Sequence, residues 1–335
     1  MNFQLRFLLC LSLFFSFGCQ TMPSNEKNEA LRIFQFHSAF WINLHHFLYN
    51  EAFRPQAHQE PFVPMNQGEK NEIEEAIGFY KINFNGKDLL FDNDLKKINN
   101  ELALAENNSD LSNVEISKET RNILEKIRPV YLKHYWEQQD KNNIHWISEV
   151  EKKLKLYGAV IKSKLEKVLN RKFIDFPYRI DVVHEANWSG AYTSDSPSHT
   201  VISEGRNSYN NYSALEMIFH EVLHTGPFEK VQEALDVEFN LHQYKDESQI
   251  WHALLFYTAG EVTREVLNSS GINYIPYAYQ NGLFSEKRKW GKFEPLIKKY
   301  WLPYIKGVSN MNEALKMIVE SIDPKENPLS GLKSE

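Results

Sequence analysis

The feature that most constrains this 335-residue chain is a pair of histidines four residues apart, in the segment FHEVLHT (219–225). On an α-helix, residues i and i+4 project from the same face, one turn apart. The imidazoles of His220 and His224 can then reach one Zn²⁺ at about 2.0–2.1 Å. Glu221 lies beside them without binding the metal. The chain must therefore form a helix here and bring a third donor to it.

The flanking residues predict the limits of this helix. Ser213 and Glu216 have the spacing of a capping box, so we expect the helix to begin at residue 213. Gly226-Pro227 is expected to end it. The apolar residues between form a stripe typical of a buried helix face: Leu215, Ile218, Phe219, Val222 and Leu223. The histidine pair is thus expected in the middle of an amphipathic helix.

The His-Glu-x-x-His sequence resembles the motif of the zincin metallopeptidases, and among them of the gluzincins. In that class a sheet with an exposed edge strand precedes the motif helix, and a later helix donates a glutamate to the metal. The order of elements over 174–268 is similar. Metzincins are excluded, because their third histidine and their glycine would fall at Lys230 and Pro227. The resemblance implies hydrolysis of a peptide or protein by a zinc-activated water, with Glu221 as general base.

The third zinc ligand is expected in the helix predicted at 248–268. Glu261 is the preferred candidate, and the resemblance implies that Glu265 orients a ligand histidine. His252 is the alternative, since a site of three histidines is chemically sound. The two cannot both bind from one straight helix, because nine residues place them on opposite faces. Two acids of the preceding helix remain weaker candidates: Glu233 and Asp236.

A tetrahedral oxyanion needs a hydrogen-bond donor in addition to the metal. Tyr277 and Tyr279 follow the third-ligand helix and are the candidates by their order in the chain, although packing is the commoner role of such tyrosines. The segment 188–193 (WSGAYT) is expected to pair with an extended peptide as an edge strand. Gly190 would permit close approach of a second backbone there, or form a bulge.

The whole pattern predicts an α+β protein that is mostly helical, with a small antiparallel or mixed sheet before the motif helix and further helices after it. We expect a helical N-terminal region at 29–173, a zincin-like metal-binding region at 174–322 and a flexible tail at 323–335. Strands are predicted at 178–185, 188–195 and 199–204. Helices are predicted at 29–53, twice within 69–106, through 117–171, and at 213–225, 229–243, 248–268, 292–306 and 310–322.

The other histidines have no partner at metal-binding spacing. His37, His45 and His46 belong to the first predicted helix, where a role in the core is expected. His199 and His184 lie on predicted strands, and a surface position is expected for His199.

The N-terminus predicts export. An apolar stretch from Phe7 to Gly18 follows one basic residue and has the length of a signal-peptide core. Cys19 comes next, and the site resembles the lipobox of bacterial lipoproteins, although Ser16 and Phe17 depart from the usual pattern. The resemblance implies a signal peptide at 1–18, a lipid on Cys19, a tether at 19–28 and a place on the bacterial cell envelope. Ordinary secretory cleavage at the same bond is the alternative.

The amino-acid composition argues against several other functions. Only two cysteines occur, which excludes a disulfide scaffold and a cysteine-based zinc site. The chain has 38 Lys and Arg against 44 Asp and Glu, so the basic surface of a nucleic-acid-binding protein is not expected.

Besides the hydrolase, two hypotheses stay open. One is a non-catalytic zinc lipoprotein acting as a binding or assembly factor, and the other is a helical scaffold in which the motif is accidental. Glu221 favours catalysis, because a structural zinc site needs no acid there.

Overall fold

The computed structural model describes residues 33–106, 108–173, 177–195, 197–243 and 249–322. The predicted signal peptide (1–18), Cys19 with its tether (19–28) and the tail (323–335) lie outside these residues. Within the described ranges, no helix has the length and apolar character needed to cross a membrane.

A four-stranded mixed sheet lies at the centre, in the order β1-β2-β4-β3. The strands are β1 (Phe34–His37), β2 (Tyr178–Val183), β3 (Ala191–Asp195) and β4 (Ser198–Ser203). β1 pairs in parallel with β2, and β2 in parallel with β4. β3 runs antiparallel to β4, with Thr193 opposite Thr200, and forms one edge of the sheet.

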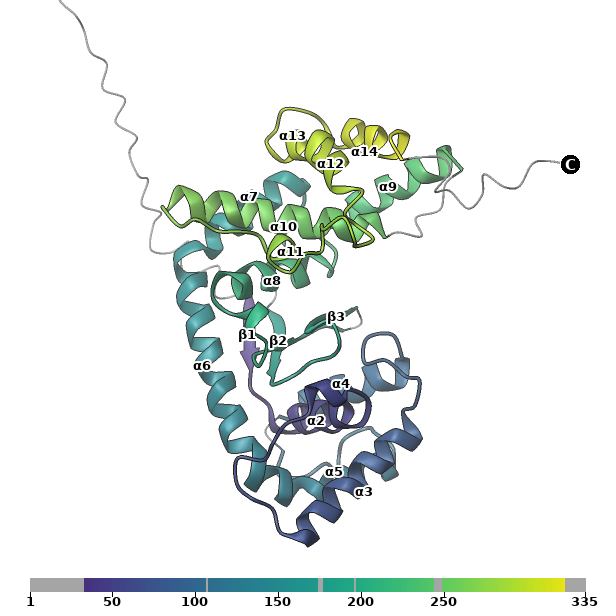
Figure 1. Ribbon diagram of the computed structural model, residues 1–335, viewed down its shortest axis with the longest axis vertical. Coiled ribbons are helices and arrows are strands. Elements are labelled where there is room, and N and C mark those ends of the chain that lie inside the picture. The colour runs from purple at the N-terminus through teal and green to yellow at the C-terminus, as the bar shows by residue number, and fades with distance from the viewer. Residues whose placement is uncertain (1–32, 107, 174–176, 196, 244–248, 323–335) are drawn as a thin grey trace, which may run out of the picture.

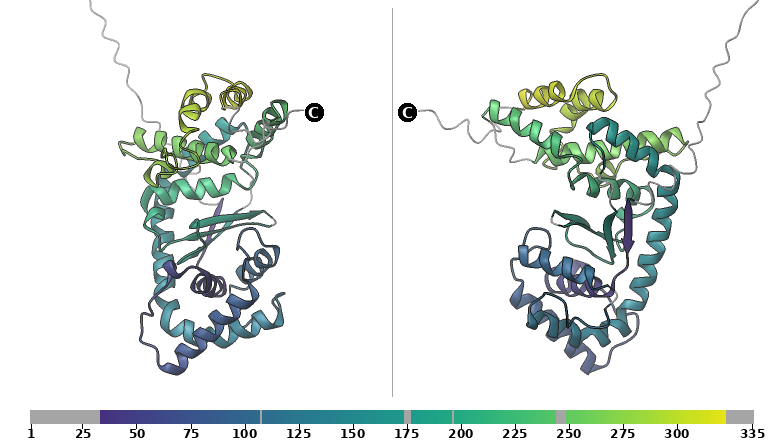
Figure 2. Two further views of the ribbon diagram at one scale, coloured as in Figure 1. Left: turned by 45° about the vertical axis from the view of Figure 1, so that its right-hand side comes forward. Right: turned by 180° about the vertical axis from the view of Figure 1, so that it is seen from behind.

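Helices cover both faces of this sheet, which gives three layers (Figures 1 and 2). Side chains that alternate along each strand enter different cores. Ile180, Val182 and Ile202 belong to the core shared with α8 and α10, whereas Val183 and Val201 belong to the core on the opposite face. Side chains of the edge strand β3 also alternate between the two faces, and this alternation decides which of them face the motif helix.

The lower layer in Figure 1 is built from α2 (Phe40–Phe53), α3 (Gln67–Asn83), α4 (Asn93–Leu104) and α5 (Lys118–Tyr131), with a short 3₁₀ turn, η1 (Pro55–Ala57). The chain then runs alongside the sheet to the upper layer as one long helix that is interrupted by two π-helical turns. Its parts are η2 (Leu132–Trp136), α6 (Glu137–Lys153), η3 (Leu154–Gly158) and α7 (Ala159–Leu169).

The upper layer begins with η4 (Asn207–Tyr209) and the motif helix α8 (Asn211–Leu223). α9 (Glu229–Leu241), the long α10 (Ile250–Ser269) and the short α11 (Tyr277–Gln280) follow. The last elements are α12 (Glu294–Leu296), η5 (Ile297–Trp301), α13 (Leu302–Ile305) and α14 (Met311–Glu320). α8 lies above the sheet, and α10 packs on α8.

The predicted fold class is confirmed at the level of a mostly helical α+β protein with a small mixed sheet. The expectation of a purely helical N-terminal region is wrong, because residues 34–37 form β1 and join the sheet. Phe34 and Phe36 recur at the strand period of two, but they directly precede the helical pattern of α2, which masked a strand of only four residues. The two predicted regions, 29–173 and 174–322, therefore share one sheet.

The predicted capping box is also wrong. α8 begins at Asn211, and its N-cap residue, Asn210, makes no side-chain cap hydrogen bond. Ser213 and Glu216 both lie in the interior of the protein. Their spacing matched a cap by chance, and burial against the loop around residue 277 gives Glu216 a different partner.

Candidate metal centre

The motif lies at the C-terminal end of α8, not in its middle as predicted. His220 and Glu221 belong to the last turn, and His224 is the C-cap residue. Its backbone still has helical dihedral angles (φ −65°, ψ −21°), so the spacing of one turn is kept. The two imidazole rings lie 5.0 Å apart between centroids.

The third histidine comes from α10. His252 lies in the first turn of that helix, which packs across α8. Its Nε2 atom lies 3.3 Å from Nε2 of His220, and Nε2 of His224 lies 3.3 Å from the same atom. One nitrogen from each ring falls within a group whose members are all within 4.8 Å of one another. Three separate side chains thus direct nitrogen atoms at one point.

This spacing fits a bound cation. Two ligands at about 2.05 Å from a tetrahedral zinc ion are separated by about 3.3 Å, as these nitrogens are. Burial lowers the pKa of His220 well below its usual value, that of His224 to about 4 and that of His252 to about 3. The rings are therefore neutral at pH 7 and offer lone pairs. Without a cation, neutral rings at this distance are joined by N–H···N hydrogen bonds, and a bound cation would take the place of those protons.

Glu261, the preferred third ligand from the sequence, does not join this group. It lies nine residues beyond His252 on α10, hence on the opposite side of the helix, and its carboxylate pairs with Arg264. Glu265 is exposed and pairs with Lys164 of α7 at 2.6 Å, so it orients no histidine. The structure thus favours His252, the alternative from the sequence, over Glu261.

Glu221 is 4% exposed and faces the edge strand of the sheet. The Thr193 hydroxyl of β3 donates a hydrogen bond of 2.8 Å to its Oε2 atom. The same hydroxyl lies 2.8 Å from that of Thr200 on β4. Burial raises the pKa of Glu221 to about 7, although the bond from Thr193 opposes this. The sequence did not single out Thr193, but alternation along β3 places it with Ala191 on the face toward α8.

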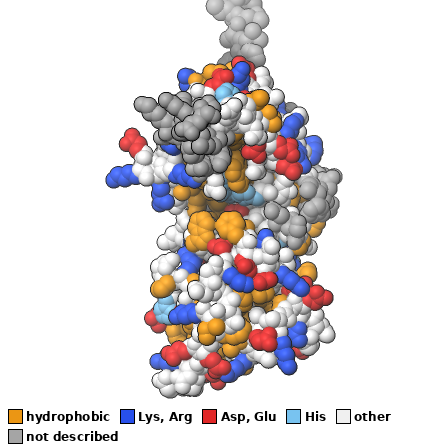
Figure 3. Space-filling model, turned by 90° about the vertical axis from the view of Figure 1, so that its right-hand side faces the viewer, with side chains coloured by type: hydrophobic (Ala, Val, Ile, Leu, Met, Phe, Trp, Pro, Cys, Tyr) orange, Lys and Arg blue, Asp and Glu red, His pale blue; other side chains and the backbone are white. Residues whose placement is uncertain are grey.

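Aromatic rings enclose the three histidines. Phe256, one turn after His252, lies 3.8 Å from the ring of His220. Trp251 stacks on His252 at 5.0 Å, and Trp290 lies 5.3 Å from it. His224 and His252 are half-buried, and Figure 3 shows histidine side chains in a hollow bordered by hydrophobic ones. The site is therefore apolar but open on one side, as a catalytic metal centre requires.

The structure separates the two candidate tyrosines. Tyr277 is buried, and its ring lies 6.0 Å from that of Phe256 and 5.4 Å from that of Tyr209. Tyr279 instead donates its hydroxyl to Glu294 of α12 at 2.9 Å. Tyr277 thus lies beside the site, and Tyr279 belongs to the packing of the C-terminal helices.

Two residues that the sequence did not indicate as part of the site hold Tyr277 in place. The fully buried Glu216, one turn before His220, accepts hydrogen bonds from the backbone N–H of Tyr277 at 3.0 Å and from the hydroxyl of Tyr274 at 2.7 Å. Burial raises the pKa of Glu216 to about 7. Tyr209 packs on Tyr277, and burial with the nearby charge of Glu221 raises the pKa of Tyr209 well above its usual value.

Four further histidines have partners outside the candidate metal centre. His45 and His46 are buried under the sheet and bond to the hydroxyls of Tyr80 and Tyr192, as expected for a core role. His37 pairs with Glu106. The expected surface position of His199 is wrong, because it is 3% exposed. It bonds to the buried Asp181 at 2.8 Å.

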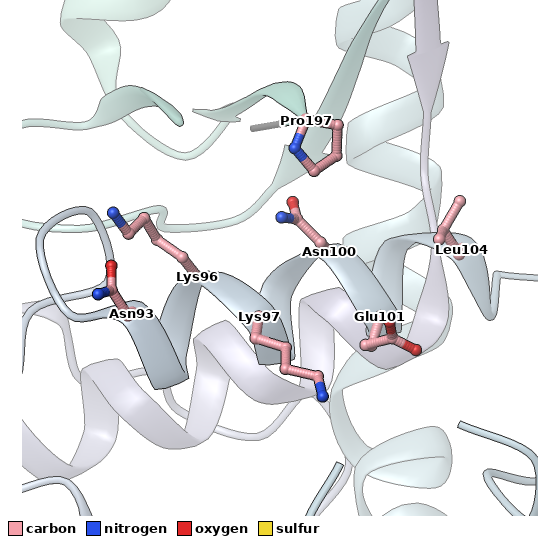
Figure 4. A pocket seen from close by; sticks show the side chains of 7 residues that line it. All are labelled: Asn93, Lys96, Lys97, Asn100, Glu101, Leu104 and Pro197. Atoms are coloured by element: carbon pink, nitrogen blue, oxygen red, sulfur yellow. The ribbon is translucent and has the colours of Figure 1, made fainter. Parts of the chain in front are cut away.

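His184, on the loop that follows β2, is half-buried and pairs with Glu204 at 2.8 Å. A separate surface pocket lies between α4 and the turn before β4 and contains none of the candidate site residues (Figure 4). It is lined by Asn93, Lys96, Lys97, Asn100, Glu101, Leu104 and Pro197.

Comparison of the chain with protein-family models, curated proteins and solved structures finds no match. The resemblance to zincins therefore rests on the His-Glu-x-x-His sequence.

Proposed function

We propose that this protein is a zinc-dependent hydrolase acting on peptides or proteins, with His220, His224 and His252 as the zinc ligands. The convergence of three imidazole nitrogens, with those of His224 and His252 each 3.3 Å from that of His220, is the observation that carries the proposal. No sulfur takes part, and three histidines with an open fourth position are a ligand set typical of catalytic zinc.

Zinc in such a site supplies a Lewis acid and lowers the pKa of a water that it binds to near 7. Glu221, next to His220 in the last turn of α8, takes a proton from the attacking water and returns it to the departing amine. Its raised pKa, about 7, suits both transfers near neutral pH. The Thr193 hydroxyl orients its carboxylate.

The substrate position follows from the sheet. β3 is an edge strand, so one row of its backbone groups is available to an extended peptide. The inner face of β3 contacts Glu221 through Thr193, so a peptide paired with this strand lies next to the general base. Tyr277, beside Phe256 and Tyr209, is the donor we assign to the developing oxyanion.

The experiment is zinc analysis of the purified protein together with hydrolysis of a peptide pool by wild type and Glu221→Gln. We expect one bound zinc in both proteins and hydrolysis by wild type alone. Zinc without hydrolysis in both would favour the non-catalytic envelope lipoprotein instead. Absence of bound zinc in wild type would exclude both the hydrolase and the zinc lipoprotein.

We retain the lipid anchor on Cys19 and the cell-envelope location as part of this proposal, on the sequence of residues 1–19.

A further inference from the structure

A loop of positive charge, residues 285–292, lies beside the three histidines. Its sequence is SEKRKWGK, with four cationic side chains and one acidic one, in a chain whose formal net charge is −6. The loop connects the short helix α11 to α12 and is not part of either helix. Such a concentration of one sign of charge produces a local potential opposite to that of the whole protein.

The backbone of this loop is compact and is held by its own hydrogen bonds. The backbone N–H of Arg288 donates to the carbonyl of Ser285 at 2.8 Å, and the N–H of Gly291 donates to the carbonyl of Arg288 at 3.1 Å. These turns bring Gly291 so close to Ser285 that a Cβ atom at residue 291 would collide with the Ser285 backbone. The ends of the loop therefore touch, and its charged side chains are held in a fixed region.

Trp290 fixes the loop to the candidate metal centre. Its ring lies 5.3 Å from that of His252 and 5.6 Å from that of Phe256. Lys289 is its chain neighbour, and consecutive Cα atoms are about 3.8 Å apart. The cationic side chains of the loop are all exposed: Lys287, Arg288, Lys289 and Lys292. Exposed cationic residues therefore flank, in sequence, a tryptophan whose ring lies next to that of His252.

We propose that this loop binds an acidic segment of the substrate, and that acidic peptides are the substrate class of this site. Among the described residues, Lys287 and Arg288 form no ion pair, so their charges are available to a ligand. A cation at the rim of an apolar cleft attracts anionic ligands more strongly than one on an open surface. The overall negative charge favours a short acidic peptide over a nucleic acid, which would be repelled elsewhere.

The cleavage of such peptides rests on the proposed function, but their binding does not, so binding is the measurement. The protein is zinc-loaded Glu221→Gln, and the probes are two fluorescent peptide pools that are identical except that one carries Asp and Glu where the other carries Asn and Gln. Fluorescence anisotropy is recorded at about 0.02 M and about 0.3 M salt, because the higher concentration screens exposed charges within a few ångströms.

We expect the acidic pool to bind about tenfold more tightly at low salt, with most of this preference lost in Lys287→Gln/Arg288→Gln and at high salt. The matched control is Lys70→Gln/Lys81→Gln, which removes two exposed charges from α3 at the opposite end of the molecule and should keep the preference (Figure 1).

Equal binding of the pools, or no binding of either, overturns the inference. Equal loss in both double variants, or tighter binding of a single-stranded oligonucleotide than of the acidic pool, does the same. Acidic binding that depends on Lys287 and Arg288, without cleavage by zinc-loaded wild type, would leave the loop as a binding site for acidic peptides and reject the proposed hydrolase together with these peptides as its substrates.

Discussion

The Thr193 hydroxyl donates a 2.8 Å hydrogen bond to Oε2 of Glu221, and this bond joins the edge strand of the sheet to the last turn of the motif helix. The two residues are 28 positions apart in sequence, and both are buried. The strand proposed to hold the substrate therefore also fixes the carboxylate proposed to act on it. A second hydroxyl, that of Thr200, lies 2.8 Å from Thr193 and holds it from the neighbouring strand.

Replacement of Thr193 by valine should lower kcat with little change in KM. Valine keeps the shape of threonine but leaves the carboxylate without its donor, and hydrogen bonds to charged groups contribute about 1.5–3 kcal/mol, which corresponds to about 10- to 100-fold in kcat. Thr193→Ser keeps the hydroxyl and should retain most of the activity. Steady-state kinetics on a peptide pool, with zinc content measured for each variant, tests this. Equal loss in the serine variant would point to packing alone.

Zinc binding should distinguish His252 from Glu261. We expect His252→Gln to lose zinc at micromolar concentrations and Glu261→Gln to retain it, because only the histidine directs a nitrogen at the other two. Both changes introduce the same residue on the same helix, so each is a control for the other. Zinc should also raise the melting temperature of wild type, since zinc at 1,000 times its Kd stabilises by about 4 kcal/mol. Zinc loss in the Glu261 variant alone would identify Glu261, the candidate preferred from the sequence, as the third ligand.

The helices and three of the strands were predictable because their periodicity is local. Apolar residues at helical spacing marked α8, α9, α10 and α14 to within a few residues, and β-branched residues marked β2 and β4. Motif spacing gave His220 and His224 for the same reason, since both lie on one turn. The choice of the proposed third ligand depends instead on how α10 crosses α8. His252 and Glu261 fit the same helix equally well in sequence, and only the tertiary contact decides between them.

Residues that act through distant partners could not be predicted. Glu216 has the spacing of a capping box, yet its partners are Tyr274 and Tyr277, about 60 residues away. Thr193 reaches Glu221 only because β3 lies at the edge next to α8. A single sequence records which face of an element is apolar, but not which other element will cover that face.

The buried carboxyl of Glu216 should make stability depend on pH. Burial raises its pKa to about 7 in the folded protein, whereas an unfolded glutamate titrates near 4.5. Between these values the folded state binds more protons, so this group's contribution to stability is full below pH 4.5 and is lost as the pH rises to about 7. Each pKa unit is worth about 1.36 kcal/mol, so the loss is about 3 kcal/mol.

Glu216→Gln removes this titration while keeping an acceptor for Tyr277. The difference in unfolding free energy between variant and wild type, measured by urea denaturation from pH 5 to 8, should shift in favour of the variant as the pH rises and level off above pH 7. The comparison is made without zinc, because metal release would add its own pH dependence. A constant difference over this range would mean that Glu216 is ionised throughout.

Gly190 should be required for the position of Tyr209, and through it of Tyr277. Its φ of +90° is unfavourable for any residue with a side chain. In addition, a Cβ atom there would lie 2.7 Å from Cε2 of Tyr209 and 2.7 Å from Nη1 of Arg206. The Tyr209 hydroxyl donates to the backbone carbonyl of Ser189, so the ring has little freedom to move away. The structure places the protein's own tyrosine against residue 190, whereas the sequence analysis considered the approach of a second backbone.

Gly190→Ala should cost about 2–3 kcal/mol of stability and lower kcat, because the displaced Tyr209 ring no longer supports Tyr277. Gly86→Ala is the control: its φ is also positive, at 73°, but a Cβ atom there meets no atom within 4 Å. The control should cost only about 1 kcal/mol from backbone strain and leave kcat unchanged. Urea denaturation gives the first difference and peptide hydrolysis the second. If both variants lost stability equally and kept full activity, backbone strain alone would explain the glycine, and the contact between residue 190 and Tyr209 would have no part in holding Tyr277 beside the site.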